Sequence, residues 1–567
     1  MLMMTHRQSL QHKTPFDIKA ARLGLLLILN GLVFVSLDLG SRVHFQGHEL
    51  IPAIKAGPTV FSGVTLLYLG MLIRRRKRTA WLASLAFYAL WEVIYLIAAT
   101  FFWINHQHLI DPPLAALINI LVPVVAITGL WAYRRAFTVR SDIRNFAIAL
   151  RISALTLGVA FVYGVLGFTL MDKRDYQQDI PSGQAIYHTI NQLGIHTSQQ
   201  LVPHTQRAFL FERSLSVLSI GAVAYSFVSL FQPLRARFGD QTEARSKAAA
   251  LLRRYPAASE DFFKLWPHDK SYFFDHSNTA GLAYAVQRGM ALVVGDPLGN
   301  PQKFDTLLEE FDELCRTNDW QIAFIHTEPL YNEWYKAHGF SLQKIGEEAI
   351  LDLTHFGEHV QRNKYFRHIR NRFEKQGYHT ELLRPPFTAN DVERLRIISE
   401  EWLALPGREE RSFVMGYYSA AYMLQSEAIM VLRDAEETIQ AFINQIPSYD
   451  LEEANFDLLR HTQKSLGNSN DYLLVNFLAS AKDRGFTRAN LGLCPLSGLG
   501  RHDESHALID NALGFVYNKG DRFYSFTGLR RFKAKYEPQW SSRYIAYRGG
   551  IAGFTRVANA LNRTMKA

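Results

Sequence analysis

The sequence has few cysteines, and it lacks the short motifs that identify most cofactor-dependent enzymes. Only Cys315 and Cys494 occur among 567 residues, which excludes a disulfide-stabilised scaffold and fits a reducing compartment. There is no Walker A loop, no Gly-x-Gly-x-x-Gly after a strand, no His-Glu-x-x-His, no Cys/His zinc spacing and no Gly-x-Ser-x-Gly. The pyrophosphate loop Arg/Gln-x-x-Gly-x-Gly/Ala, which acetyl-CoA-dependent acetyltransferases carry, is incomplete. We therefore predict no cofactor and no metal, and any group that the protein transfers must arrive already activated.

The charge is basic overall but unevenly distributed. The chain has 62 Lys+Arg and 52 Asp+Glu, a net charge of +10. Residues 1–234 contain 20 basic and 10 acidic residues, and the remainder contains 42 of each. The whole excess belongs to the first part, so the net charge does not by itself indicate a nucleic-acid-binding face.

The first part contains apolar stretches long enough, or nearly so, to cross about 30 Å of hydrocarbon. They are Leu23–Leu39, Ala56–Ile73, Ala80–Ile104, Leu114–Tyr133, Phe146–Leu170 and Ser214–Phe231. Basic loops alternate with loops poor in Lys and Arg, and the run from Arg74 to Arg78 is the most basic of them. By the positive-inside rule we expect six transmembrane helices with both termini in the cytoplasm.

The second part alternates strand-like and helix-like segments, which predicts mixed α/β layers. Strands are expected at Ala291–Val294, Ile322–Ile325, Ala349–Leu353, Ile429–Leu432, Ile439–Ile446 and Ala489–Leu493, and helices at Thr242–Arg254, Lys303–Thr317 and Asp471–Arg484. The pattern occurs twice, with a junction near Pro385-Pro386. We therefore expect a transmembrane domain in residues 1–237, a first lobe in 238–380 and a second lobe with the C-terminal tail in 381–567.

Two segments of the first lobe carry candidate binding residues. Glu347 and Glu348 precede an apolar run and could bind an amine or serve only as a cap. The segment 362–375, RNKYFRHIRNRFEK, predicts a helix with aromatic residues on one stripe and cations such as Arg367 and Arg370 on another. A cluster of this kind suits phosphate, on an RNA backbone or on a lipid head group.

The second lobe contains the remaining candidates. Asp457 and Arg460 are three residues apart, so on a helical turn they would share a face and could pair. As a site, the carboxylate would hold an ammonium while the guanidinium holds a phosphate or an oxyanion. Segment 491–498, LGLCPLSG, ends a strand in a turn where an active-site loop could form, and 526–536 is aromatic and basic.

Taken in order, these motifs resemble those of a known family. GDPLG (295–299), IGEEAILDL (345–353), the basic helix, SFVMG (412–416), Asp-x-x-Arg (457–460), NLGLCPLSGLG (490–500) and GLRRFKAKYEPQW (528–540) are similar to motifs of the aminoacyl-phosphatidylglycerol synthases, the multiple peptide resistance factors. The similarity covers about residues 240–545. It implies an α-helical membrane bundle followed by a tandem of acetyltransferase-like (GNAT) folds. It also implies transfer of an amino acid, lysine or alanine in that family, from aminoacyl-tRNA to phosphatidylglycerol.

The resemblance also implies where the chemistry takes place. Asp457, Arg460 and Lys533 or Lys535 would be catalytic, and Glu347, Glu348, Arg367, Arg370 and Arg530 would bind substrate. Full-length members carry about twice as many spans and couple synthesis to flipping of the lipid, so the count of six spans leaves flipping open. The chain would be a multi-pass protein of the bacterial inner membrane with a cytoplasmic catalytic domain, and it could form a homo-oligomer.

Two other interpretations of the sequence stay open. The same chemistry could serve another acceptor, diacylglycerol or a peptidoglycan peptide as in the Fem-type transferases. The chain could also be a lipid translocase or scaffold without enzymatic activity.

Overall fold

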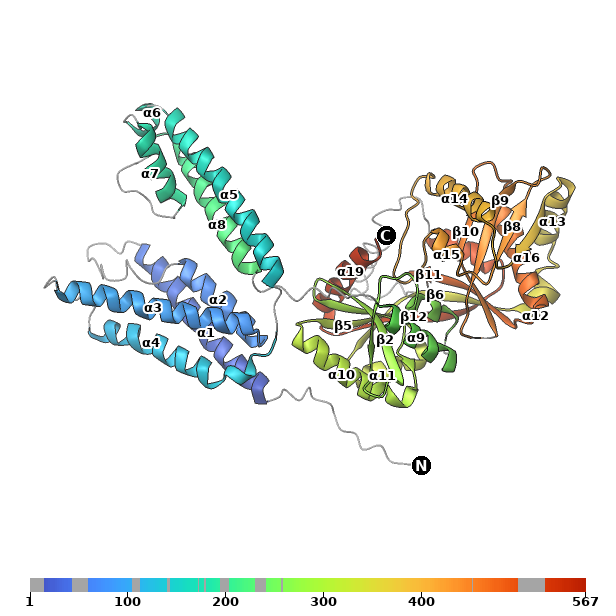
Figure 1. Ribbon diagram of the computed structural model, residues 1–567, viewed down its shortest axis with the longest axis horizontal. Coiled ribbons are helices and arrows are strands. Elements are labelled where there is room, and N and C mark those ends of the chain that lie inside the picture. The colour runs from blue at the N-terminus through green and yellow to red at the C-terminus, as the bar shows by residue number, and fades with distance from the viewer. Residues whose placement is uncertain are drawn as a thin grey trace. The chain divides into compact units, whose positions relative to one another are not determined.

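The computed structural model contains two compact units, a helical unit made mainly of residues 11–234 and an α/β unit made mainly of residues 235–567 (Figure 1). It describes residues 15–42, 60–104, 113–139, 143–171, 173–177, 180–193, 203–229, 241–255, 258–450, 452–497 and 526–566. Part of one predicted motif, residues 498–500, lies outside the described residues.

The helical unit confirms that each predicted apolar stretch contributes a helix. The six are α1 (Pro15–Arg42), α2 (Val60–Arg74), α3 (Arg78–Ile104), α4 (Pro113–Ala132), α5 (Ile143–Leu170) and α8 (Gln206–Ser229). The segment between the last two, expected to be a loop, contains two more helices, α6 (Lys173–Tyr176) and α7 (Ser182–Leu193). Small residues allow α1 and α2 to touch, since a Cβ on Gly24 would lie 2.5 Å from the carbonyl oxygen of Gly70.

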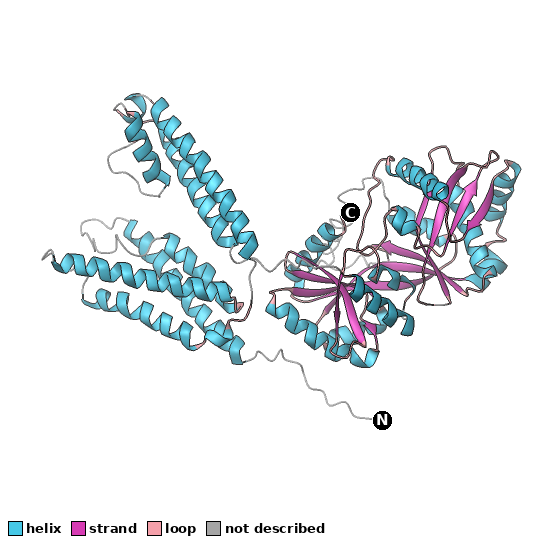
Figure 2. Ribbon diagram, viewed as in Figure 1, coloured by secondary structure: helices cyan, strands magenta, loops and turns pink. Residues whose placement is uncertain are grey.

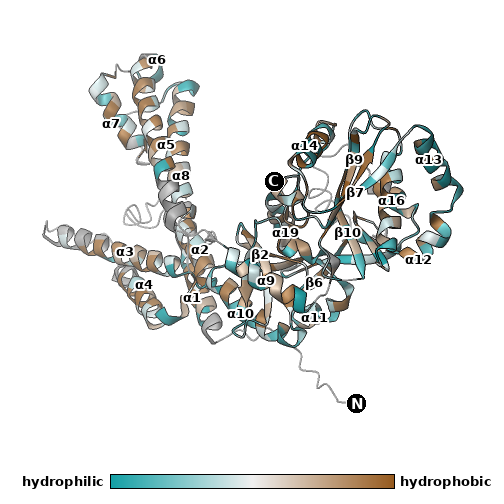
Figure 3. Ribbon diagram, turned by 45° about the vertical axis from the view of Figure 1, so that its right-hand side comes forward, coloured by the Kyte–Doolittle hydropathy of each residue, from teal (hydrophilic) through white to brown (hydrophobic). Residues whose placement is uncertain are grey.

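Hydrophobic residues predominate in the coloured parts of these helices (Figure 3). Of the large apolar side chains that are exposed among the described residues, all but Leu330, Tyr365, Leu424 and Ile551 lie within residues 25–228. Such a surface is typical of helices that face lipid. Two segments in the described part are long and apolar enough to cross a membrane, Arg151–Leu170 and Gln206–Ser229, and Gly63–Arg74 and Ile120–Ala132 are shorter apolar helices. The number of six spans stays a prediction.

The α/β unit is built on one continuous sheet (Figure 2). Its order is β1-β2-β3-β5-β12-β6-β11-β10-β9-β8-β7, with β4 paired to β2. The strands are β1 (Ser271–Phe274), β2 (Ala280–Gln287), β3 (Met290–Val294), β4 (Leu298–Gly299), β5 (Gln321–Thr327), β6 (Ser341–Asp352), β7 (His379–Leu383), β8 (Ala428–Arg433), β9 (Ile439–Ile446), β10 (Glu453–His461), β11 (Arg488–Pro495) and β12 (Gln539–Tyr547). All six predicted strands are confirmed, within β3, β5, β6, β8, β9 and β11.

Each half of the sheet has one parallel pair of strands joined by a helix. Strands β3 and β5 are parallel and are connected through α10 (Phe304–Thr317), and β10 and β11 are parallel and are connected through α16 (Ser469–Asp483). Helix α10 buries Phe304, Leu307, Leu308, Phe311 and Cys315. This three-and-four spacing places one apolar stripe against the sheet. The repeated arrangement confirms the α/β architecture with two halves.

Two segments cross the boundary expected at residue 380. Strand β12 inserts between β5 and β6, and α19 (Gly550–Thr564) packs its Phe554 and Val557 in the core of the first half. In the other direction, α12 (Leu353–His355) and α13 (Lys364–Lys375) join the core of the second half, together with α16. Each half of the α/β unit therefore contains elements from the other side of residue 380. The expected limits of the two lobes stay a prediction. The other helices of this unit are α9 (Thr242–Arg254), α11 (Asn332–Ala337), α14 (Ala389–Leu403), α15 (Ala420–Met423) and α18 (Phe526–Ala534).

Candidate active site

The candidate site lies where the two parallel strands β10 and β11 separate. Their pairing runs only from Glu453–Arg488 to Asn455–Asn490. Beyond that point the register of β10 with β9 is interrupted between Phe456 and Leu459, and that of β11 with β6 between Asn490 and Leu493. Such irregularities bend strands and re-aim side chains. The pairing of β10 with β11 therefore ends at Asn455 and Asn490, and Asp457 and Arg460 lie just beyond that point on β10.

Asp457 is a partly buried carboxylate on a strand. The helical turn considered for Asp457 and Arg460 is wrong, because both residues belong to β10. The Oδ2 atom of Asp457 accepts the hydroxyl of Tyr422 at 2.5 Å and the amide of Gly416 at 3.0 Å. Burial raises the pKa of Asp457 to about 6, although both hydrogen bonds and the nearby Arg460 lower it. Both donors bind the same oxygen, which leaves Oδ1 for another group.

Gly416 is required for this geometry. A Cβ at that position would lie 2.3 Å from Oδ2 of Asp457 and equally close to the hydroxyl of Tyr422. The last residue of the motif SFVMG is therefore a glycine because the carboxylate and the phenol approach its backbone directly.

Arg460 is held by a carboxylate that the sequence did not single out. Its guanidinium donates to both oxygens of Glu410 at 2.9 Å, and one of its nitrogens also donates to the hydroxyl of Ser399. The guanidinium lies over the ring of Trp402, 4.7 Å from its centroid. This bidentate pair fixes the plane of the arginine. In the sequence, Glu410 follows Glu409 shortly before the motif SFVMG. Two adjacent glutamates are too common to indicate a site.

Lys533 and Lys535 have different environments. Lys533 is buried, and its Nζ donates to the carbonyl oxygens of Gly492 at 2.8 Å and Leu493 at 3.1 Å, where β11 is irregular. Burial lowers the pKa of this amine. Lys535 points elsewhere and pairs with Asp471 on α16. Of the two candidate lysines, only Lys533 contacts the separated strands.

The predicted glutamates face opposite sides of β6. Glu347 pairs with Lys344 at 2.8 Å and with Arg530 at 3.2 Å, and Arg530 also stacks on Trp540. These cations lower the pKa of Glu347. Glu348 is completely buried. Neither carboxylate is free, so an amine would have to compete with cations already in place.

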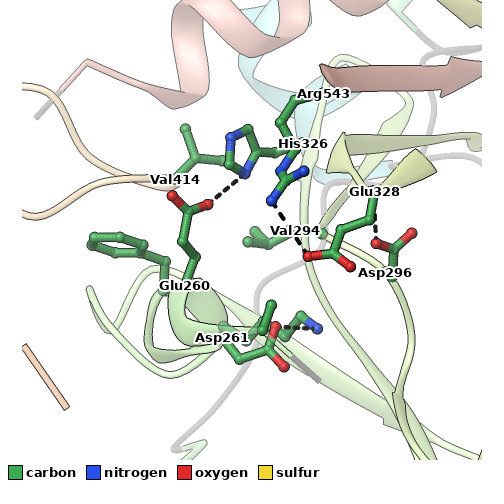
Figure 4. Close-up of a pocket in the computed structure, with 12 residues that line it drawn as sticks. Glu260, Asp261, Val294, Asp296, His326, Glu328, Val414 and Arg543 are labelled. Carbon is green, nitrogen blue, oxygen red and sulfur yellow. Dashed lines mark hydrogen bonds and ion pairs between the residues drawn. The ribbon is translucent and has the colours of Figure 1, made fainter. Parts of the chain in front are cut away.

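Glu348 belongs to an ionic network that the sequence did not predict. His326 lies between two carboxylates, with Nδ1 2.9 Å from Glu260 and Nε2 2.9 Å from Glu348, and Arg543 lies 2.5 Å from the other oxygen of Glu348. Figure 4 shows His326 beside Glu260, and Arg543 beside Glu328, at a cavity of about 30 Å³, room for about one water molecule. The two carboxylates raise the pKa of His326 to about 10 in spite of its burial. His326 has a φ of +73°, a strained conformation.

The same three side chains could in principle hold a metal ion, because their ligand atoms lie within 4.8 Å of one another. Both ring nitrogens of His326 already contact carboxylates, and Arg543 already pairs with Glu348. The arrangement therefore fits an ion-pair network better than a metal centre.

A larger cleft of about 610 Å³ opens beside the small cavity. It shares Glu260, Glu328 and Arg543 with the cavity and extends to Asn490, at the last pair of β10 and β11. A cleft of this size is typical of a binding site for a small molecule.

The basic segment forms α13 as predicted. Phe366, Ile369 and Phe373 are buried, while Arg367 and Arg370 are exposed on the opposite side. None of the cations of residues 362–375 forms an ion pair with a carboxylate within the residues that the structure describes. They are Arg362, Lys364, Arg367, Arg370, Arg372 and Lys375. The helix therefore presents an uncompensated positive surface.

Comparison with known proteins supports the sequence resemblance. Phosphatidylglycerol lysyltransferases of Staphylococcus epidermidis and Staphylococcus aureus are each 32% identical to the chain, over 279 and 284 residues. These regions are 49% and 50% of this chain but only 33% of each relative, so the chain spans about a third of the length of the curated relatives it matches. The structure of L-PGS from Bacillus licheniformis is 29% identical and superimposes with a TM-score of 0.50 over 58% of this chain and 98% of the other. The predicted GNAT-like fold of the C-terminal part agrees with this match.

The matched region contains every element of the candidate site. The family model for the C-terminal domain of phosphatidylglycerol lysyltransferase aligns with residues 249–547, which include β10, β11, α13 and α18. This alignment covers more than half of the chain, and the chain belongs to the phosphatidylglycerol lysyltransferase C-terminal family.

Proposed function

We propose that this protein transfers an amino acid from aminoacyl-tRNA to a hydroxyl group of phosphatidylglycerol. The observation that carries the proposal is the pair of separated parallel strands. A partly buried carboxylate, Asp457, lies on one strand, and its Oδ1 accepts no hydrogen bond from the described residues. A buried amine, Lys533, is bound to the other strand. Family membership supplies the substrate class.

The ester of an aminoacyl-tRNA is already an activated acyl donor, so the reaction needs no nucleotide. The lipid hydroxyl attacks the ester carbonyl, and negative charge develops on the carbonyl oxygen. Oδ1 of Asp457 would hold the α-ammonium of the amino acid. Lys533 uses two of its three N–H groups on backbone carbonyls, which leaves the third for the oxyanion or the lipid phosphate.

Arg460 has a different role in this proposal. Glu410 occupies its two terminal nitrogens, so it orients the site beside Asp457 and is a positioning residue. The proton of the lipid hydroxyl could leave through the terminal hydroxyl of the tRNA, which is the leaving group. Glu347, Glu348 and Arg530 would shape the wall of the site through their ion pairs.

The cationic face of α13, with Arg367 and Arg370, would contact the phosphate backbone of the tRNA. Its charge is uncompensated within the described part of the chain, and phosphate contacts of this kind dominate affinity for RNA. The helical unit would hold the α/β unit on the cytoplasmic side of a bacterial membrane with six spans, next to its lipid substrate. Which amino acid is transferred would depend on the shape of the cleft beside Asn490.

The test is a transfer assay with the full chain in membranes, supplied with a panel of charged tRNAs and lipid acceptors. Wild type should form aminoacyl-phosphatidylglycerol, and Asp457→Ala, Arg460→Ala and Lys533→Ala should each lose at least tenfold of the rate. Asp483→Ala, an exposed aspartate on α16, is the matched control and should keep the wild-type rate. Wild-type rates for Asp457→Ala and Arg460→Ala would show the assignment to be wrong. Transfer only to diacylglycerol or to a peptidoglycan peptide would show that the acceptor is not phosphatidylglycerol. Absence of transfer to any acceptor would favour a translocase or scaffold.

A further inference from the structure

A second cavity, of about 620 Å³, lies between α9 and the segments that flank β8 and β9. Its lining includes Arg245 and Arg253 of α9, Trp266 and His268, and Glu427 and Tyr449. None of the residues assigned to the transfer reaction lines it. We call this cavity the α9 pocket.

The α9 pocket has two arginines on one wall. Arg245, Ala249 and Arg253 are spaced by four residues, so they share one face of the helix. Neither arginine forms an ion pair with a carboxylate anywhere in the described residues. The other cations of α9 are engaged, since Lys247 pairs with Glu243 at 3.1 Å and Arg254 lies over the ring of Tyr255. The two arginines that face the pocket are the ones left available for an anion.

The aromatic floor adds a buried donor. Trp266 is 9% exposed and stacks on Tyr422, 5.6 Å between ring centroids. Its indole N–H is buried and has no hydrogen-bond partner within the described residues. His268 packs against the same indole at 4.2 Å. Burial and the nearby Arg245 lower the pKa of His268.

The charge of the pocket fits an anion with one negative charge. Glu427 opposes the two arginines, and its carboxylate accepts from the side chain of Gln445 at 2.9 Å. One carboxylate against two guanidinium groups leaves a small positive excess, which suits one phosphodiester better than the continuous charge of an RNA strand. Trp, Tyr and Arg side chains are also typical of the membrane–water interface. In the sequence, α9 begins at Thr242, soon after α8, a helix apolar enough to cross a membrane, ends at Ser229.

We propose that the α9 pocket binds the phosphodiester head group of an anionic membrane lipid, at a site separate from the transfer centre. Arg245 and Arg253 would hold the phosphate oxygens. Glu427, with its remaining acceptor capacity, would take hydroxyl groups of the head group. The proposal does not depend on the transfer activity, because no residue of that site takes part.

The test measures binding of soluble probes to the full chain in a neutral detergent by titration calorimetry. The probes are glycerophosphoglycerol, inorganic phosphate and a short single-stranded RNA ending in CCA. The variant Arg245→Ala/Arg253→Ala removes the proposed ligands, and Lys247→Ala/Arg254→Ala removes the same charge from α9 outside the pocket. Asp457→Asn reports on the transfer site, and the melting temperature of each variant confirms that it is folded.

We expect glycerophosphoglycerol to bind wild type, the control variant and Asp457→Asn within twofold of one another, and Arg245→Ala/Arg253→Ala at least tenfold more weakly. Absence of binding, or equal binding by both double variants, would overturn the proposal. If inorganic phosphate binds as tightly as glycerophosphoglycerol and depends on the same arginines, the ligand is free phosphate and the lipid proposal is overturned. RNA binding that alone depends on these arginines would assign the pocket to nucleic acid. A chain that binds the head group here and yet transfers no amino acid would contradict only the proposed function.

Discussion

The hydroxyl of the buried Tyr422 donates to Oδ2 of the partly buried Asp457 at 2.5 Å. This hydrogen bond stabilises the charged form of a carboxylate whose pKa burial raises to about 6. Removing the hydroxyl should therefore raise the pKa of Asp457 further. If transfer requires the carboxylate, Tyr422→Phe should move the acid limb of the pH–rate profile upward by about one unit. The rate should fall several-fold near pH 6 and little at pH 8. Tyr378→Phe, at a half-buried tyrosine in another part of the second half, is the control, and equal profiles for both variants would contradict this role.

Glu410 is expected to stabilise the fold, because it is the carboxylate partner of the buried Arg460. Glu410→Ala leaves Arg460 buried without its carboxylate, and breaking such a pair costs about 3 kcal/mol. We expect a clear fall in the melting temperature of the full chain in detergent. Glu410→Ala combined with Arg460→Met should recover part of the loss, since the unpaired charge is gone. A double variant that melts lower than Glu410→Ala would contradict this account.

Gly416→Ala tests the direct approach of the backbone to Asp457. The added methyl group would lie 2.3 Å from Oδ2, so the carboxylate or Tyr422 must move. Because a displaced catalytic group can cost about 100-fold, we expect a loss of at least tenfold in the transfer rate. Gly467→Ala, where a Cβ meets nothing within 4 Å, should keep the wild-type rate. Equal rates for the two variants would show that the contact is not needed.

The stability contributed by His326 should depend on pH in a defined direction. Its folded-state pKa is raised to about 10 by Glu260 and Glu348, from 6.5 in the unfolded chain. The contribution is therefore fully present below about pH 6.5 and decreases as the pH rises toward 10. The difference in melting temperature between wild type and His326→Gln should be larger at pH 6 than at pH 9. A difference that grows with pH would contradict the charged network.

The cationic face of α13 should affect tRNA and not the chemical step. Arg367→Ala/Arg370→Ala should raise KM for aminoacyl-tRNA with little change in kcat, and it should reduce the dependence of log affinity on log salt by about one to two. Arg316→Ala/Lys336→Ala removes two charges that are already paired with Glu313 and Glu333. It should leave both quantities unchanged. An unchanged KM in the α13 variant would show that another surface of the protein binds the tRNA.

Local pattern was sufficient for much of the fold. Strands such as β3 and β5 are short apolar runs bounded by turn residues, and α13 repeats its apolar residues at helical spacing, so each was predictable from neighbours in the chain. Strand β10 was not predicted because its polar residues, Asp457 among them, interrupt the apolar run. Those residues belong to the candidate site.

The partners of the site residues could not be predicted in the same way. Tyr422 and Gly416 meet Asp457 across 35 and 41 positions of sequence, and Glu410 meets Arg460 across 50. At such separations, the sequence positions of two residues do not indicate that they are in contact in the fold. The return of β12 to the first half, far from β5 in sequence, is a contact of the same kind.

The sequence by itself determined the division into an apolar helical part and an α/β part, the basic face of α13 and the candidate residues Asp457, Arg460 and Lys533 or Lys535. Composition, periodicity and motif order are local properties of the chain, and they require no knowledge of its path. Only the tertiary structure decided that Lys533, not Lys535, meets the separated strands, that Arg460 is occupied by Glu410, and that His326 lies between two carboxylates. Those facts depend on burial and on contacts between distant segments, which exist only once the sheet has brought the segments together.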